Sequence, residues 1–123
     1  MAPMVPFILL AALGGALGSA LRAALGLWVP FPWGTFAVNV TGSLAIGMLA
    51  VPLLLHARGP HPLAPLLITG VLGGYTTFSA FSLDALRLVE DGRAGLAGAY
   101  VVGSVALSLG ACGLGLWLAR MAT

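Results

Sequence analysis

The sequence predicts an all-α membrane protein with four transmembrane helices in a single domain, residues 1–123. Three observations predict this class. Hydrophobic residues make up 60% of the 123 residues and charged residues only 7%, whereas a soluble domain has about 25% charged residues. The apolar residues gather in four segments of roughly 20 residues or more, which is the length that crosses a bilayer. The segments between them are too short to hold a soluble domain.

Composition also excludes several function classes. The five basic residues are all arginine and face three acidic residues, a surplus too small to indicate nucleic-acid binding. Cysteine and histidine do not have the spacing of metal ligands, and the sequence offers no nucleophile–base pair, so we do not expect an enzyme. We expect a multi-pass protein of the plasma (inner) membrane, with the lipid bilayer as its solvent.

The first segment, Met4–Trp28, combines a close-packing pattern with a charge. Gly14-x-x-x-Gly18 is the spacing at which two membrane helices approach closely. Arg22 follows one turn later, although an arginine at the bilayer centre is unfavourable by about 2.5–3.5 kcal/mol. Two interpretations stay open: Arg22 reaches toward the nearby membrane surface, or it faces a wet vestibule or caps backbone carbonyls.

The second segment follows the tight turn Val29–Trp33 and extends from Gly34 to about Leu55. Thr35, Asn39 and Ser43 are spaced four apart and therefore share one helical face. Asn39 has the only amide side chain of the sequence. A buried amide in lipid needs partners, so we expect Asn39 to face protein or water. Hydrogen bonding between helices is the alternative to a ligand-binding role.

The third segment, Pro62–Val89, follows the loop His56–His61 and predicts a helix that breaks near its middle. Gly73 and Gly74 weaken the helix by roughly 1 kcal/mol each relative to alanine. The hydroxyls of Tyr75–Thr77 follow, and short hydroxyl side chains offer the backbone alternative hydrogen bonds. A break inside a membrane is tolerated only where protein or water meets the freed backbone groups. Broken membrane helices often mark ion or substrate sites.

The end of the third segment and the whole fourth segment carry the remaining polar residues. Asp84 and Arg87 are three apart, which predicts an ion pair. After the loop Glu90–Arg93, the fourth segment extends from Ala94 to about Leu118. Three hydroxyl residues spaced four apart form a polar stripe on it: Tyr100, Ser104 and Ser108.

The arginines give the chain almost no preferred orientation. With four spans, Arg58 and Arg120 lie on one side of the membrane, and Arg87 and Arg93 lie on the other, toward which Arg22 leans. Orientation is normally set by an excess of Lys and Arg in cytoplasmic loops. We therefore expect insertion in both directions and an antiparallel, dual-topology homodimer. A single orientation set by one arginine is the alternative.

Three stretches resemble signatures of one known family. Gly14–Arg22 (GGALGSALR), Gly34–Gly42 (GTFAVNVTG) and Gly73–Phe81 (GGYTTFSAF) are similar to the small bacterial fluoride channels, the Fluc or CrcB family. The third stretch is the most specific because it is long and unusual. Ala80 departs from the pattern, since family members often carry Thr or Ser there, which removes one hydroxyl beside the phenylalanines.

The resemblance implies a dual-topology homodimer with two pores that export toxic fluoride from the cytoplasm. It implies a central, structural sodium ion held by the backbone carbonyls of Gly73 and Thr76. Arg22 is either a vestibule residue or a structural one. The implied pore-lining residues are Asn39, Phe78, Phe81, Tyr100, Ser104 and Ser108.

Fluoride conduction is chemically consistent with these residue types. Fluoride is small and strongly hydrated, so a pore must replace its water with other hydrogen-bond donors. Amide and hydroxyl groups are donors, and the edge of an aromatic ring is electropositive. A series of weak, neutral donors lets an anion enter without trapping it.

Two other functions stay open. A small proton-coupled multidrug exporter with four helices needs a carboxylate inside the membrane, and Asp84 is the one acid within a segment. A non-transporting membrane subunit would pack through glycines alone and would not need the polar stripes. Fluoride efflux from liposomes separates all three functions.

Overall fold

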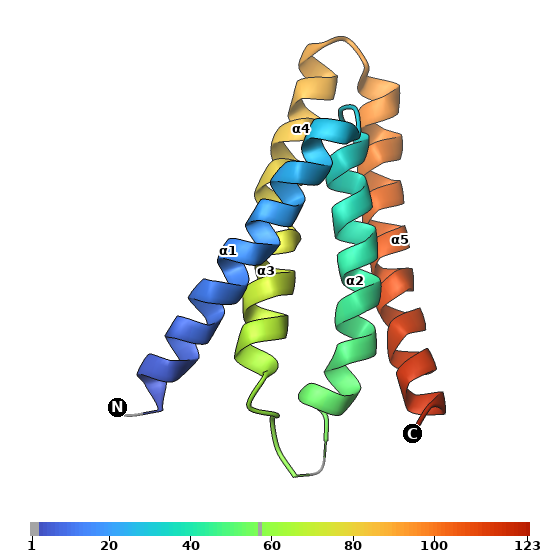
Figure 1. Ribbon diagram of the computed structural model, residues 1–123. Coiled ribbons are helices and arrows are strands. Elements are labelled where there is room, and N and C mark those ends of the chain that lie inside the picture. Colours follow the sequence, from blue (N-terminus) through green and yellow to red (C-terminus); the bar gives the residue numbers. More distant parts are fainter. Residues whose placement is uncertain (1–2, 57) are drawn as a thin grey trace.

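The computed structural model describes residues 3–56 and 58–123, and within them four helical spans are long and apolar enough to cross a membrane. They are α1 (Met4–Trp28), α2 (Trp33–Leu53), a composite third span (Pro65–Glu90) and α5 (Ala94–Met121). Figure 1 shows both termini at the same end of the bundle. The predicted all-α class with four spans is confirmed, and each span lies within a few residues of its predicted bounds.

The third span is composed of three helices. It begins with η1 (Pro65–Leu72), a π-helix, continues in α3 (Gly73–Tyr75) and resumes in α4 (Phe78–Glu90). Between α3 and α4, Thr76 and Thr77 have extended backbone, with ψ angles of 155° and 118°. The π-helical winding was not predicted, because its apolar composition is the same as that of a buried α-helix.

Glycines bring α1 and the third span into backbone contact. A Cβ atom on Gly14 would collide with the carbonyl oxygen of Leu66, and one on Gly18 with that of Val71. From the other helix, a Cβ on Gly70 would lie 2.7 Å from the Cα of Gly14. The close-packing pattern predicted for the first segment is therefore confirmed, and we call this contact the glycine seam.

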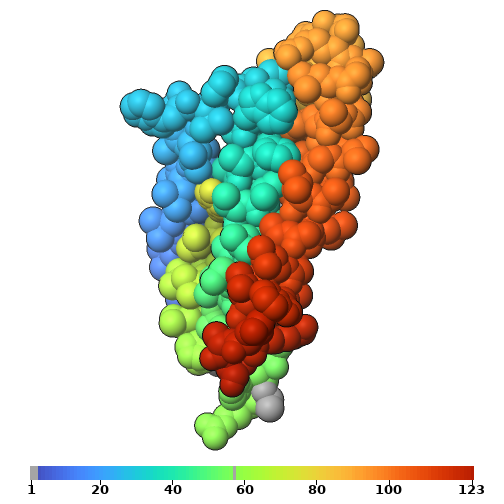
Figure 2. All heavy atoms as spheres, turned by 90° about the vertical axis from the view of Figure 1, so that its right-hand side faces the viewer, coloured from blue at the N-terminus to red at the C-terminus, as the bar shows by residue number. Residues whose placement is uncertain are grey.

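A second glycine contact joins α2 and α5, which run side by side (Figures 1 and 2). A Cβ on Gly47 would collide with the carbonyl oxygen of Cys112, and one on Gly115 with that of Leu44. Nearer the loop between α4 and α5, Phe81, Leu88, Ala97 and Tyr100 form a small buried cluster. Most other large apolar side chains point outward, as lipid-facing residues do.

The ion pair predicted between Asp84 and Arg87 is wrong: these two described residues have other partners. Asp84 is buried and accepts a hydrogen bond from the Tyr100 hydroxyl at 3.4 Å. The Arg87 guanidinium lies 4.5 Å from the centre of the Phe31 ring, a cation–π contact. Burial of the carboxylate among α4 and α5 outweighed the spacing along the helix on which the prediction depended.

Candidate functional site

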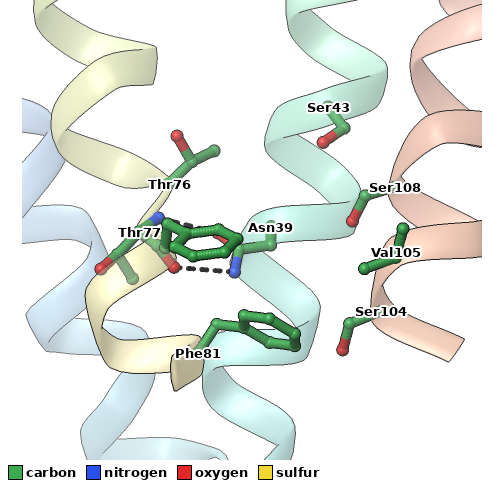
Figure 3. A pocket seen from close by; sticks show the side chains of 9 residues that line it. Asn39, Ser43, Thr76, Thr77, Phe81, Ser104, Val105 and Ser108 are labelled. Carbon is green, nitrogen blue, oxygen red and sulfur yellow. Dashed lines mark hydrogen bonds between the residues drawn. The ribbon is translucent and has the colours of Figure 1, made fainter. Parts of the chain in front are cut away.

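A pocket of about 190 Å³, lined by both polar and apolar side chains, lies where the third span is interrupted. Its wall combines residues of α2, the Thr76–Thr77 segment, α4 and α5 (Figure 3). The lining residues are Asn39, Ser43, Thr76, Thr77, Phe78, Phe81, Ser104, Val105 and Ser108. Five of the six side chains that the resemblance implied for a pore lie together in this wall.

Asn39 connects α2 to the interruption through two hydrogen bonds. Its Nδ2 donates to the carbonyl oxygen of Thr77 at 3.0 Å, and its Oδ1 accepts from the Thr77 N–H at 2.8 Å (Figure 3). The two interpretations of Asn39 are thus compatible, because it bonds to another span and also lines the pocket. An amide nitrogen carries two N–H groups, so one of them remains for a ligand.

The two extended residues redirect the hydrogen bonds of the helix. In a continuous α-helix the N–H of Thr77 would bond to the carbonyl of Gly73, and that of Ala80 to the carbonyl of Thr76. Here Thr77 donates to Asn39, and the Ala80 N–H donates to the Thr77 hydroxyl at 3.1 Å. Thr77 is therefore the N-cap of α4, a position that favours threonine. The carbonyls of Gly73 and Thr76 lose these helical donors.

Arg22 reaches the same interruption from α1. Its Nε donates to the carbonyl oxygen of Gly74 at 3.0 Å, an oxygen that the N–H of Phe78 would bond in a continuous helix. Of the interpretations left open for Arg22, the observed one is the capping of a backbone carbonyl. The interruption is thus bounded by two polar side chains, Arg22 from α1 and Asn39 from α2.

Three aromatic rings follow one another from the pocket into the protein. Phe78 and Phe81 have ring centres 5.5 Å apart, and Phe81 and Tyr100 have centres 5.4 Å apart. Phe81 is only 8% exposed, whereas Phe78 is 78% exposed. Phe81 is therefore a fixed part of the pocket wall, and Phe78 is a pocket residue that this single chain leaves largely uncovered.

The hydroxyls of α5 differ in their surroundings. The Oγ of Ser104 is buried and has no hydrogen-bond partner within residues 3–56 and 58–123. Ser108 lines the pocket one turn further along. Tyr100 is not among the described lining residues, because it lies behind Phe81 and donates to Asp84. Ser104 is thus a buried polar group whose hydroxyl is left without a partner among the described residues, although most buried polar groups have one.

The predicted pore set omitted four residues of the wall: Ser43, Thr76, Thr77 and Val105. Of these, Thr76 was predicted only as a sodium ligand through its backbone carbonyl. The spacing of four had already placed Ser43 on the helical face of Asn39, but the resemblance did not include it in the pore set. Thr77 lies within the motif of the third segment, but its role as N-cap depends on where the helix resumes. The sequence does not distinguish Val105 from the many other apolar residues of the fourth segment, so its place in the pocket wall could not be predicted.

Comparisons with known proteins identify the family of this chain. The profile of the family described as "CrcB-like protein, Camphor Resistance (CrcB)" matches residues 9–116. A relative from Rhizobium meliloti named fluoride-specific ion channel FluC is 55% identical, with 92% of this chain and 95% of that protein aligned. Proteins of the same name from Paracoccus denitrificans (54%; 89% and 90%) and Rhizobium leguminosarum (50%; 91% and 94%) are also similar. The chain therefore belongs to the CrcB family.

Proposed function

We propose that this multi-pass membrane protein is a fluoride-selective channel that exports fluoride from the cytoplasm through passive conduction. Membership of the CrcB family and the names of its relatives support this function. The observation that carries it in this chain is the Ser104 hydroxyl, which is buried at the pocket and lacks a partner among the residues described. A buried hydrogen-bond donor without an acceptor destabilises the protein unless a ligand accepts its hydrogen bond.

The pocket suits a small, strongly hydrated anion. The free N–H of Asn39 and the hydroxyls of Ser104 and Ser108 are donors that would replace part of its water shell. All of them are neutral, so each holds an anion weakly enough to release it to the next. Phe78 and Phe81 would add electropositive ring edges to the passage.

The interrupted third span is, in this proposal, the centre of the functional protein. Its freed carbonyls at Gly73 and Thr76 fit a hard cation such as sodium, because such cations prefer oxygen ligands. When bound, the ion would supply positive charge to carbonyls that the helix no longer satisfies. The Gly74 carbonyl oxygen is not proposed as a sodium ligand, since it already accepts a hydrogen bond from Arg22.

An antiparallel homodimer with two pores would complete both sites. One chain offers only two of these carbonyls, and a second copy would double the number of oxygen ligands. A second copy would also cover Phe78, which is 78% exposed in the single chain. The even distribution of arginines between the two sides permits both orientations in one membrane.

The proton-coupled exporter remains the second candidate because Asp84 is buried in a membrane span. However, Asp84 is outside the described pocket wall and accepts a hydrogen bond from Tyr100. Exchange of protons with a substrate requires a carboxylate that the substrate can reach. The Asp84–Tyr100 pair, in contrast, resembles a structural hydrogen bond between α4 and α5.

Fluoride efflux from liposomes tests the proposed function. We expect purified protein to release fluoride rapidly down its gradient, with chloride retained, and without an applied pH gradient. Drug uptake that depends on a pH gradient, with no fluoride release, would instead favour the exporter. Labelling of single-cysteine variants in cells tests the topology: we expect loop positions accessible from both sides, and access from one side only would contradict the dual-topology dimer.

A further inference from the structure

We propose that Ser43 is a further fluoride-contacting residue, a hydroxyl donor on α2 that raises fluoride conduction and the preference for fluoride over chloride. This inference depends on the proposed fluoride channel function and extends its site by one residue. The family resemblance did not include Ser43 in the pore set.

Position is the first argument. Ser43 lines the pocket one helical turn beyond Asn39, and Ser108 lies one turn beyond Ser104 on α5. Figure 3 shows Ser43 and Ser108 on neighbouring helices toward the same end of the pocket. A turn of four residues advances about 6 Å. The polar lining of the pocket therefore extends beyond Asn39 and Ser104 on both helices, through Ser43 on α2 and Ser108 on α5.

The unused hydroxyl of Ser43 is the second argument. Hydroxyls in membrane helices commonly bond back to the carbonyl four residues earlier. Thr41 does so with Ala37 at 2.7 Å, Thr76 with Leu72 at 2.9 Å and Ser82 with Phe78 at 2.9 Å. Ser43 makes no side-chain hydrogen bond to any described residue, so its O–H remains available to a ligand in the pocket.

Ser43 would therefore help to transfer the anion along the pocket. An anion moving past Asn39 and Ser104 would meet only one further hydroxyl donor of the wall, Ser108, if position 43 were apolar. With Ser43 it would meet hydroxyl donors on both helices. Fluoride gains more from each hydrogen-bond donor than the larger chloride does, because its charge is more concentrated. Loss of the Ser43 donor should therefore reduce the flux of fluoride more strongly than it reduces any leak of chloride.

The test compares three variants in the liposome efflux assay. We expect Ser43→Ala to reduce the fluoride efflux rate about 3- to 10-fold, the effect of one typical hydrogen bond, and to lower the fluoride-to-chloride ratio. Ser43→Thr keeps the hydroxyl and should retain at least about half of the flux. The control, Thr41→Val, removes a hydroxyl from the same helix that lies outside the described pocket wall and is already bonded to Ala37 and Tyr75. Its flux should stay within about twofold of wild type.

Three outcomes would overturn the inference. One is an unchanged flux and selectivity for Ser43→Ala. Another is an equal loss for Ser43→Ala and Ser43→Thr, which would indicate packing rather than hydrogen bonding. The third is a loss that accompanies an altered size-exclusion profile or melting temperature. Absence of fluoride flux from the wild-type protein would instead contradict the proposed function itself, so the two failures are distinguishable.

Discussion

The two halves of the third span make opposite kinds of contact. Its first half, η1 and α3, meets α1 backbone to backbone across the glycine seam, where even a Cβ atom would collide. Its second half, α4, borders a pocket whose wall carries an amide and several hydroxyls. The glycines let the helix backbones pack in direct contact. The polar side chains instead surround a pocket, and some of their hydrogen-bond donors have no partner among the described residues. A single span thus combines a rigid contact with a binding site.

The interruption at Thr76 and Thr77 is what allows this difference. If the helix continued, the hydrogen bonds of the Thr77 and Ala80 amides would stay inside it. Because Asn39 and the Thr77 side chain accept them instead, α4 is free to take a different path from α3.

Disruption of the glycine seam should have the largest effect. In Gly14→Ala the new methyl group meets the Leu66 carbonyl, and backbone cannot move aside as a side chain can. We expect a loss of stability of about 3 kcal/mol or more, seen as a much lower melting temperature in detergent and little monodisperse protein. Gly15→Ala is the matched control, because no described atom outside its own helix lies within 4 Å of the place its new methyl group would take. Similar behaviour of the two variants would contradict the seam.

The contrast between the two halves was only partly predictable from sequence. The four spans and the Gly14–Gly18 contact follow from composition and spacing, which depend on local chemistry. Glycine and hydroxyl content indicated where the third helix would weaken. The partners at that point could not be predicted, since Thr77 pairs with Asn39 across 38 positions of sequence. For the same reason, the Asp84–Arg87 spacing gave a wrong ion pair: Tyr100 approaches Asp84 from another helix.

Within the pocket, Asn39 should have the strongest effect on conduction. Asn39→Ala removes both hydrogen bonds to Thr77 and the free N–H. Two hydrogen bonds of about 1–1.5 kcal/mol each correspond to a flux loss on the order of 100-fold. Hydrogen exchange at the Thr77 amide should also accelerate, because its acceptor is gone. Fluoride efflux at the wild-type rate, together with slow Thr77 exchange, would show that another residue holds the interruption.

The two phenylalanines should separate stability from conduction. Phe81→Ile and Phe78→Ile both keep apolar bulk and remove the ring edge, so we expect each to lower fluoride flux about tenfold or more. Only Phe81 is buried in the single chain, so Phe81→Ile should also lose about 1–2 kcal/mol of stability. Efflux measured beside thermal melting of the same preparations checks both effects. Wild-type flux from both variants would mean that the rings only pack.

Ser104 should show the smallest effect on stability, and with the opposite sign. Its buried Oγ lacks a partner within the described residues, and an unsatisfied buried group destabilises a protein by about 1–3 kcal/mol. In fluoride-free buffer, Ser104→Ala should therefore melt at the same temperature as wild type or slightly higher, while its fluoride flux falls about 3- to 10-fold. Added fluoride should raise the melting temperature of wild type, because a ligand of the folded state stabilises it, and should raise that of the variant less. If Ser104→Ala instead has a lower melting temperature than wild type without fluoride, the hydroxyl stabilises the fold and already makes a hydrogen bond within the protein. If Ser104→Ala both raises the melting temperature and lowers fluoride conduction, the Ser104 hydroxyl is a group that has no partner in the folded protein and hydrogen-bonds to fluoride instead.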